Sequence, residues 1–82
     1  MTITVLYFAA LRELLGLNEE TLSDVVVPLP VHAFAQHLVL RHPQLGPRLG
    51  SVRFAVNEVF VGASAEINDG DTVALIPPVS GG

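Results

Sequence analysis

The last fifteen residues of the chain, 68–82, read NDGDTVALIPPVSGG. Asn68-Asp69-Gly70-Asp71 predicts a tight turn, because Asn, Asp and Gly tolerate the backbone angles that such turns require. Thr72 to Ile76 has the alternation typical of a strand, with Val73 and Leu75 facing inward. Pro77-Pro78 ends that strand, since proline has no N–H to donate to a sheet.

The beginning of the chain predicts another strand. Thr2 to Phe8 is rich in β-branched and aromatic residues, which favours an extended conformation. Ala9 to Leu15 changes to helical spacing, and Gly16 can end this helix in the left-handed conformation. A strand followed at once by a short helix is therefore expected.

The middle of the chain predicts a weaker strand and then the main helix. Glu20 to Val27 carries the strand pattern, and Pro28 closes it. Pro30 suits the first position of a helix, which His42-Pro43 stops. The apolar residues between these points recur at the spacing of one helical face: Val31, Phe34, Ala35 and Leu38. Residues 45–50 form a compact connection rather than a domain linker.

Two more short strands, Ser51 to Val56 and Val59 to Val61, are predicted around a turn at Asn57-Glu58. The order is then strand, strand, helix, strand, strand, strand, which is an α+β layout. A right-handed parallel crossover places the first and last strands side by side in a mixed five-stranded sheet. One main helix covers it, as in the ubiquitin-like β-grasp. We expect this domain over residues 1–76 and a flexible C-terminal Gly-Gly tail over 77–82.

The composition fits one small domain and excludes several classes of function. Hydrophobic residues make up 50% of the 82 and charged residues 15%, so one core can form. The absence of cysteine excludes disulfides, thiolate metal sites and a cysteine nucleophile. The net charge is −4, and all four basic residues are arginines: Arg12, Arg41, Arg48 and Arg53. Such dispersed arginines on an acidic chain predict no binding to nucleic acid or membranes.

The sequence contains no apolar run near the roughly 20 residues that a membrane helix needs. No secretory signal is evident at its start, so we expect a cytoplasmic protein.

No group of side chains predicts a metal or acid–base site. The three histidines are spaced by five residues, which places them on different faces of a helix: His32, His37 and His42. Asp69 and Asp71 flank a turn glycine, where such residues serve the backbone. The four serines lack nearby histidines and nucleophile-elbow glycines: Ser23, Ser51, Ser64 and Ser80. We predict no metal site and no catalytic side chain.

The tail carries the strongest functional signal, because it stops at Gly81-Gly82. Glycine allows a backbone to enter a narrow channel, so an enzyme could reach the main-chain carboxylate of Gly82. Pro77-Pro78 lowers the entropic cost of ordering the tail. A Gly-Gly terminus can also be no more than a frayed end.

Strand parity adds a second signal. It places one set of side chains toward the helix: Ile3, Val5, Tyr7, Val59, Val61, Val73 and Leu75. Leu6, Phe8, Phe60 and Ile76 then face outward, and Phe8 and Ile76 lie beside the root of the tail. An exposed apolar face there predicts a protein interface, unless Phe8 or Leu6 folds into a minor core.

These residues resemble the sulfur-carrier small subunits of molybdopterin synthase. The match lies in Tyr7 to Gly16, in Ala55-Val56-Asn57 and, with the highest specificity, in Asp69 to Gly82. The middle of the chain matches only in pattern, and Pro28-Leu29-Pro30 replaces the polar helix cap that is commoner in the family.

The resemblance implies a function in molybdenum cofactor biosynthesis. An activating enzyme would use ATP to adenylate the Gly82 carboxylate, and a sulfur donor would convert it to a thiocarboxylate. The tail, Pro77-Pro78-Val79-Ser80-Gly81, would insert into the large subunit and deliver sulfur to precursor Z. The family's contact residues correspond to Phe8, Phe60 and Ile76. The resemblance also implies a heterotetramer of two small and two large subunits, with no permanently bound cofactor.

Three other functions fit parts of the pattern. A sulfur carrier for thiazole synthesis shares the fold and the Gly-Gly end, although the sequence 77–80 favours the pterin pathway. A ubiquitin-like modifier would join Gly82 to lysines of target proteins, although the chain has no lysine on which to build chains of itself. A plain interaction module would not need Gly82 at all.

Overall fold

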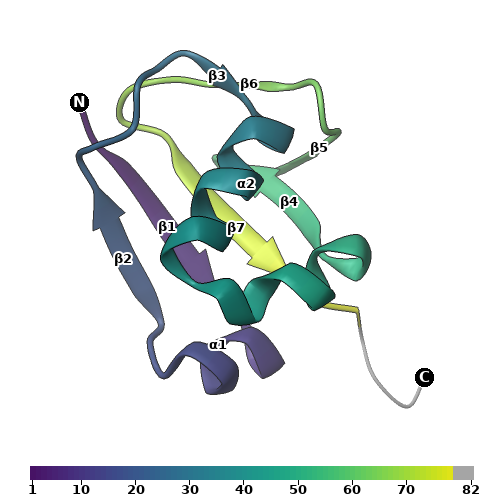
Figure 1. Ribbon diagram of the computed structural model, residues 1–82. Coiled ribbons are helices and arrows are strands. Elements are labelled where there is room, and N and C mark those ends of the chain that lie inside the picture. The colour runs from purple at the N-terminus through teal and green to yellow at the C-terminus, as the bar shows by residue number, and fades with distance from the viewer. Residues whose placement is uncertain (79–82) are drawn as a thin grey trace.

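The computed structural model describes residues 1–78, which form a mixed five-stranded sheet (Figure 1). The strand order is β2-β1-β7-β4-β5. The strands are β1 (Ile3–Tyr7), β2 (Glu19–Leu22), β4 (Arg53–Val56), β5 (Val59–Val61) and β7 (Thr72–Ile76). β1 and β7 are parallel neighbours at the centre, and the other neighbours are antiparallel. The predicted pairing of the first and last strands is therefore confirmed.

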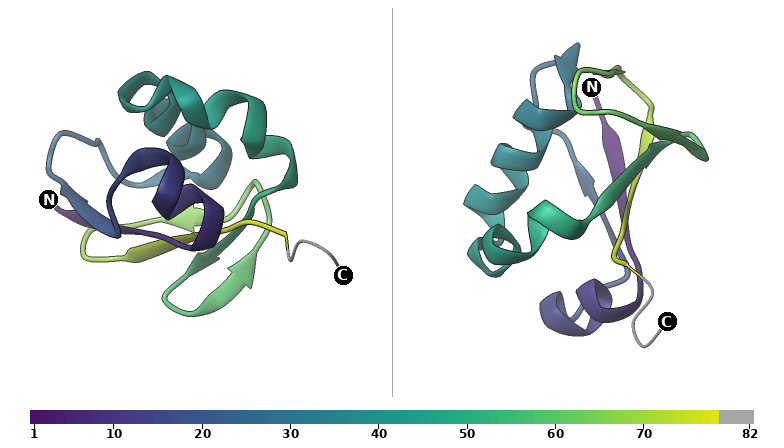
Figure 2. Two further views of the ribbon diagram at one scale, coloured as in Figure 1. Left: turned by 90° about the horizontal axis from the view of Figure 1, so that it is seen from below. Right: turned by 90° about the vertical axis from the view of Figure 1, so that its right-hand side faces the viewer.

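Three helical segments accompany the sheet: α1 (Ala9–Leu15), α2 (Val31–Arg41) and the 3-10 helix η1 (Pro43–Ser51). Figure 2 shows α2 and η1 on one side of the sheet, and no helix of residues 1–78 lies on the opposite side. α1 sits at the end where β1 stops. Gly16 ends α1 with a φ of 73°, and its N–H donates to the Arg12 carbonyl at 2.9 Å. This is the left-handed stop that the sequence predicts.

The core lies between the sheet and the helices. α2 contributes Val31, Phe34 and Leu38, which recur at the predicted helical spacing and are at most 2% exposed. The sheet contributes its inward residues, which are equally buried: Ile3, Val5, Tyr7, Val73 and Leu75. Burial of these side chains is the main stabilising term, at about 1.5–3 kcal/mol for a large aliphatic or aromatic residue.

Several boundaries differ from the prediction. β2 ends at Leu22 rather than Val27, because Leu22 pairs with Ile3, the first residue of β1, and no strand remains to pair with residues 23–27. Val25 turns into the core at 5% exposure, whereas Val26 is 77% exposed. β4 begins at Arg53 because η1 continues to Ser51.

The entry to the main helix also differs. Pro30 is the residue before α2 rather than its first residue, with extended φ and ψ of −74° and 155°. It belongs to β3 (Leu29–Pro30), which pairs with β6 (Glu66–Ile67) in a small second sheet. Two-residue strands are too short for a periodic pattern, so the sequence did not predict this sheet.

Of the predicted inward residues, five are buried, Val61 is half-buried and Val59 is exposed. Its pairing with Val56 places it on the helix side of the sheet, yet it is 63% exposed. β5 is an edge strand, and Val59 lies at its start beside the Asn57-Glu58 turn, beyond the buried cluster. The predicted side of Val59 is therefore confirmed, although its edge position leaves the side chain exposed.

Candidate functional site

The root of the tail lies at the C-terminal end of β7, the central strand of the sheet. β7 runs between β1 and β4 and ends at Ile76, after which Pro77 is half-buried and Pro78 exposed. β1 ends at the same edge, since Tyr7 pairs with Leu75 in the parallel ladder. The C-terminal ends of the two parallel strands, β1 and β7, thus lie side by side. The predicted tail residues Val79, Ser80, Gly81 and Gly82 lie outside the described residues.

An apolar surface covers the helix-free side of the sheet. Strand register places four residues in one row across it, because Leu6 pairs with Ala74, Ala74 with Ala55, and Ala55 with Phe60. Phe60 is 52% exposed and Phe8 43%. We call this surface the outer patch; it consists of Leu6, Phe8, Phe60, Ala74 and Ile76, whereas Ala55 lies in the same row but is only 5% exposed. The outer patch therefore contains the four residues that strand parity predicts to face outward: Leu6, Phe8, Phe60 and Ile76.

Two arginines lie near the tail root, and one of them, Arg53, also borders the outer patch. Arg53 pairs across the ladder with Ile76, and its guanidinium carbon lies 4.2 Å from the centroid of the Phe60 ring. Arg48 lines a hollow of about 190 Å³ together with Pro77 and Pro78. The linear sequence showed only dispersed arginines. The fold brings these two to the end of β7.

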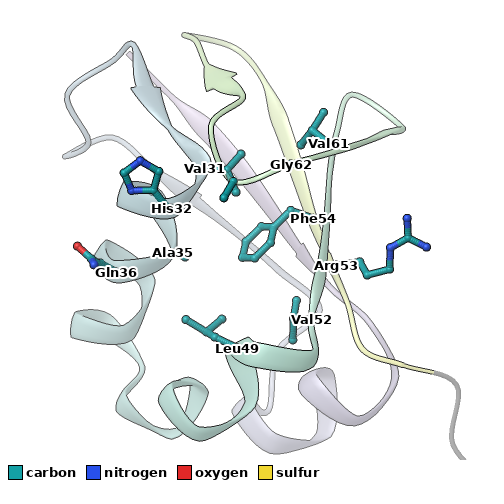
Figure 3. Close-up of a pocket in the computed structure, with 11 residues that line it drawn as sticks. Val31, His32, Ala35, Gln36, Leu49, Val52, Arg53, Phe54, Val61 and Gly62 are labelled. Carbon is teal, nitrogen blue, oxygen red and sulfur yellow. The ribbon is translucent and has the colours of Figure 1, made fainter.

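A separate cleft of about 440 Å³ opens between α2 and the β4–β5 hairpin (Figure 3). Its lining is mostly apolar, with the exposed His32 and Gln36 at its α2 side. Figure 3 shows the Arg53 side chain extending away from the other lining residues. The cleft contains no carboxylate, so it lacks an acid–base pair. No sequence pattern predicted it, because its walls come from segments far apart in the chain.

The most concentrated group of titratable side chains surrounds Glu20 on β2. Its carboxylate accepts a hydrogen bond from the Tyr7 hydroxyl at 2.6 Å and lies 2.6 Å from His42 Nε2. Arg41 Nη2 is 3.4 Å from the same carboxylate. The sequence predicts only that His42-Pro43 ends the helix, because the partner Glu20 lies 22 positions away.

Burial and the carboxylate act together on Tyr7. Burial and the hydrogen bond to Glu20 raise the pKa of Tyr7, so this hydroxyl remains a donor at neutral pH. Burial also raises the pKa of Glu20, but the hydrogen bonds from Tyr7 and His42, with the nearby charges, outweigh it and hold that pKa below 4.5. An ionised, triply contacted Glu20 joins β1, β2 and the end of α2. This arrangement stabilises the fold rather than activating a nucleophile.

The remaining candidate groups can be located within the described residues. Within residues 1–78, no three His, Cys, Asp or Glu side chains are grouped as metal ligands. Asp69 accepts the Thr2 N–H at 2.8 Å, and Asp71 accepts the Asn68 N–H at 2.8 Å, so both serve the backbone as expected. No helix in the described part of the chain is long and apolar enough to cross a membrane.

Comparisons with known proteins identify the family of the chain. The model of the ThiS family matches residues 5–82. The molybdopterin synthase sulfur carrier subunit of Chlamydomonas reinhardtii is 39% identical over 84 residues, covering 100% of both chains. That of Escherichia coli (strain K12) is 37% identical over 83 residues, covering 98% of this chain and 99% of its own.

Solved structures confirm the predicted ubiquitin-like β-grasp. The small archaeal modifier protein SAMP1 of Haloferax volcanii superposes with a TM-score of 0.88 at 28% identity, over 100% of both chains. Because the family model spans residues 5–82 and the relatives match over nearly their full length, the chain belongs to the ThiS family and, within it, resembles the molybdopterin synthase sulfur carrier subunits.

Proposed function

We propose that the chain is the sulfur carrier subunit of a molybdopterin synthase and acts in molybdenum cofactor biosynthesis. The observation that carries the proposal is its match to carrier subunits over the full length of the chain, together with the Gly81-Gly82 end. A carrier needs neither a metal site nor an activated side chain, because its reactive group is the main-chain carboxylate. Among residues 1–78 no three metal ligands are grouped, and the Tyr7 hydroxyl, which donates to Glu20, stays protonated.

The chemistry requires activation of that carboxylate. A carboxylate is a poor electrophile, so its oxygen first attacks the α-phosphorus of ATP on an activating enzyme, and pyrophosphate leaves. A sulfur nucleophile from a separate donor then displaces AMP and leaves a thiocarboxylate on Gly82. The thiocarboxylate sulfur is in turn the nucleophile toward precursor Z. ATP is a substrate of the activating enzyme and need not stay bound to this chain.

The position of the tail root suits delivery into a partner. Four residues follow Pro78, and an extended chain spans at most about 3.3–3.6 Å per residue, so the carboxylate can reach about 13–14 Å beyond Pro78. The large subunit would bind the outer patch, with contacts at Phe8, Phe60 and Ile76, while the tail enters its active site. We propose two carriers and two large subunits in the assembly.

A ubiquitin-like modifier is the second candidate, and its support is the likeness to the small archaeal modifier protein of Haloferax volcanii. The two functions share adenylation and differ in the acceptor, which is sulfur for a carrier and a lysine amine for a modifier. The absence of lysine in this chain permits modification of a target but not chains of itself.

The deciding experiment is the intact mass of the protein after incubation with ATP, the activating enzyme and a sulfur donor. A carrier gains the mass difference between sulfur and oxygen, and the product converts precursor Z when the large subunit is added. A variant that lacks Gly82 should gain nothing. Gly50→Ala is a matched control, since an added Cβ there meets no atom within 4 Å. Attachment to target lysines without a sulfur-bearing product would favour the modifier.

A further inference from the structure

The two arginines beside the tail root have no acidic partner within the described residues. The salt bridges of residues 1–78 involve Arg41 but neither Arg48 nor Arg53. Resting on the proposed function, we infer that the protein which binds the outer patch presents carboxylates to Arg53 and Arg48, one on each side of the entering tail. These two pairs would set the register in which the tail enters.

Arg53 is arranged to receive a carboxylate. Its guanidinium lies over the face of Phe60 at 4.2 Å, and stacking on a ring leaves the N–H groups free along the edges of the guanidinium plane. Those groups match the two oxygens of a carboxylate in bidentate geometry. Because Phe60 already restricts the arginine, less side-chain entropy is lost when the pair forms.

Arg48 stands on the other side of the tail root. It belongs to η1, where the Ser51 hydroxyl donates to its backbone carbonyl at 3.2 Å, and it lines the hollow that Pro77 and Pro78 complete. Its side chain is exposed. Arg12 also lacks a salt bridge in the described part, but it does not line this hollow.

The charges of the chain are separated along β7. Asp69 and Asp71 lie in the turn before the strand, whereas Arg53 pairs with Ile76 at its end. Five residues of strand span roughly 16 Å, which exceeds the screening length of about 8 Å at physiological ionic strength. The charges of Asp69 and Asp71 are therefore largely screened at the arginine end of β7.

The two arginines are not placed to bind the C-terminal carboxylate of the tail itself. With the tail extended into a partner, that carboxylate lies about 13–14 Å beyond Pro78, outside direct contact with either guanidinium. A carboxylate on the surface that meets the outer patch lies within reach. The favoured partner is therefore an apolar protein surface with acidic residues at its rim, as in complexes where rim charges steer association.

The absence of lysine makes a direct test possible. Arg53→Lys and Arg48→Lys each introduce the only lysine of the chain and keep the charge. A water-soluble carbodiimide then joins that amine to a contacting carboxylate, with loss of water. The complex used is the intact chain with the molybdopterin synthase large subunit of the same organism. Gln36→Lys, at the cleft on α2, is the matched control.

We expect the introduced lysine of both variants to link to Asp or Glu of the large subunit, as mapped by mass spectrometry, while the introduced lysine of Gln36→Lys does not. We also expect Arg53→Gln to weaken binding about tenfold at 0.05 M salt and about twofold at 1 M, where screening shortens to about 3 Å. Intact binding without a link, or a link only to the chain's own C-terminal carboxylate, would overturn the inference and leave the proposed function standing. Failure of the unmodified chain to bind the large subunit would overturn both.

Discussion

Replacing Phe60 with alanine should separate partner binding from folding. Phe60 is 52% exposed in the free chain. For a side chain of roughly 200 Å², about 100 Å² is then available for burial against a partner. At about 25 cal/mol per Å² this burial contributes about 2.5 kcal/mol, so its loss should weaken large-subunit binding about 60-fold.

The same substitution should leave the protein folded. It removes the Arg53 contact, worth about 0.5–1 kcal/mol at an exposed site, and part of a half-buried ring. The expected loss in the free energy of unfolding is about 1–2 kcal/mol, compared with about 3–5 kcal/mol for Phe34→Ala in the core. Phe34 is 0% exposed, which accounts for the difference.

The assay is calorimetric titration of the large subunit with each variant, paired with thermal unfolding of the free chain. Leu40→Ala is the matched control, since Leu40 is an apolar residue of α2 that is 82% exposed but lies away from the outer patch. It should change neither quantity. Folded Phe60→Ala that binds within twofold of the original chain would refute the assignment of the outer patch as the interface.

Three further predictions concern stability. The folded-state pKa of Glu20 lies below its ordinary 4.5, so the stability that its ionised form contributes is present above that pH and is lost as pH falls through the folded pKa. Glu20→Gln should therefore lower the unfolding temperature at pH 7. The difference in unfolding temperature between the variant and the original chain should shrink when both are measured below pH 4.5. Gly16→Ala should cost about 1–2 kcal/mol, measured by urea unfolding, because φ is 73° although space for a Cβ is open. Asn57→Gly keeps the positive φ of 50° but loses two side-chain hydrogen bonds to the segment that starts β7, and should cost about 1–3 kcal/mol. Asn57→Ala should cost more than Asn57→Gly in the same unfolding series, and equal losses would contradict the argument from φ.

The fold could be predicted where local patterns coincide with tertiary burial. The alternation in β1 and β7 and the helical spacing of Val31, Phe34 and Leu38 each report a face that is buried in the structure. Gly16 is equally local, because only its own φ decides where α1 stops. Such signals need no knowledge of distant residues.

What the sequence did not predict depends on pairs that are far apart in the chain. Glu20 and His42 meet only because α2 returns over β2. Arg48 and Arg53 reach the tail root because η1 ends and β4 begins there. Val59 has the right parity but belongs to an edge strand, and parity carries no information about whether a helix covers that edge.

The central place of β7 has a mechanical consequence. A force that pulls on the tail acts along β7, which is hydrogen-bonded to β1 on one side and to β4 on the other. The two ladders are then loaded in shear, so many hydrogen bonds must yield together instead of opening one after another from a frayed edge. Under the proposed function, withdrawal of the tail from a partner would pull on both ladders at once, and the domain would stay folded.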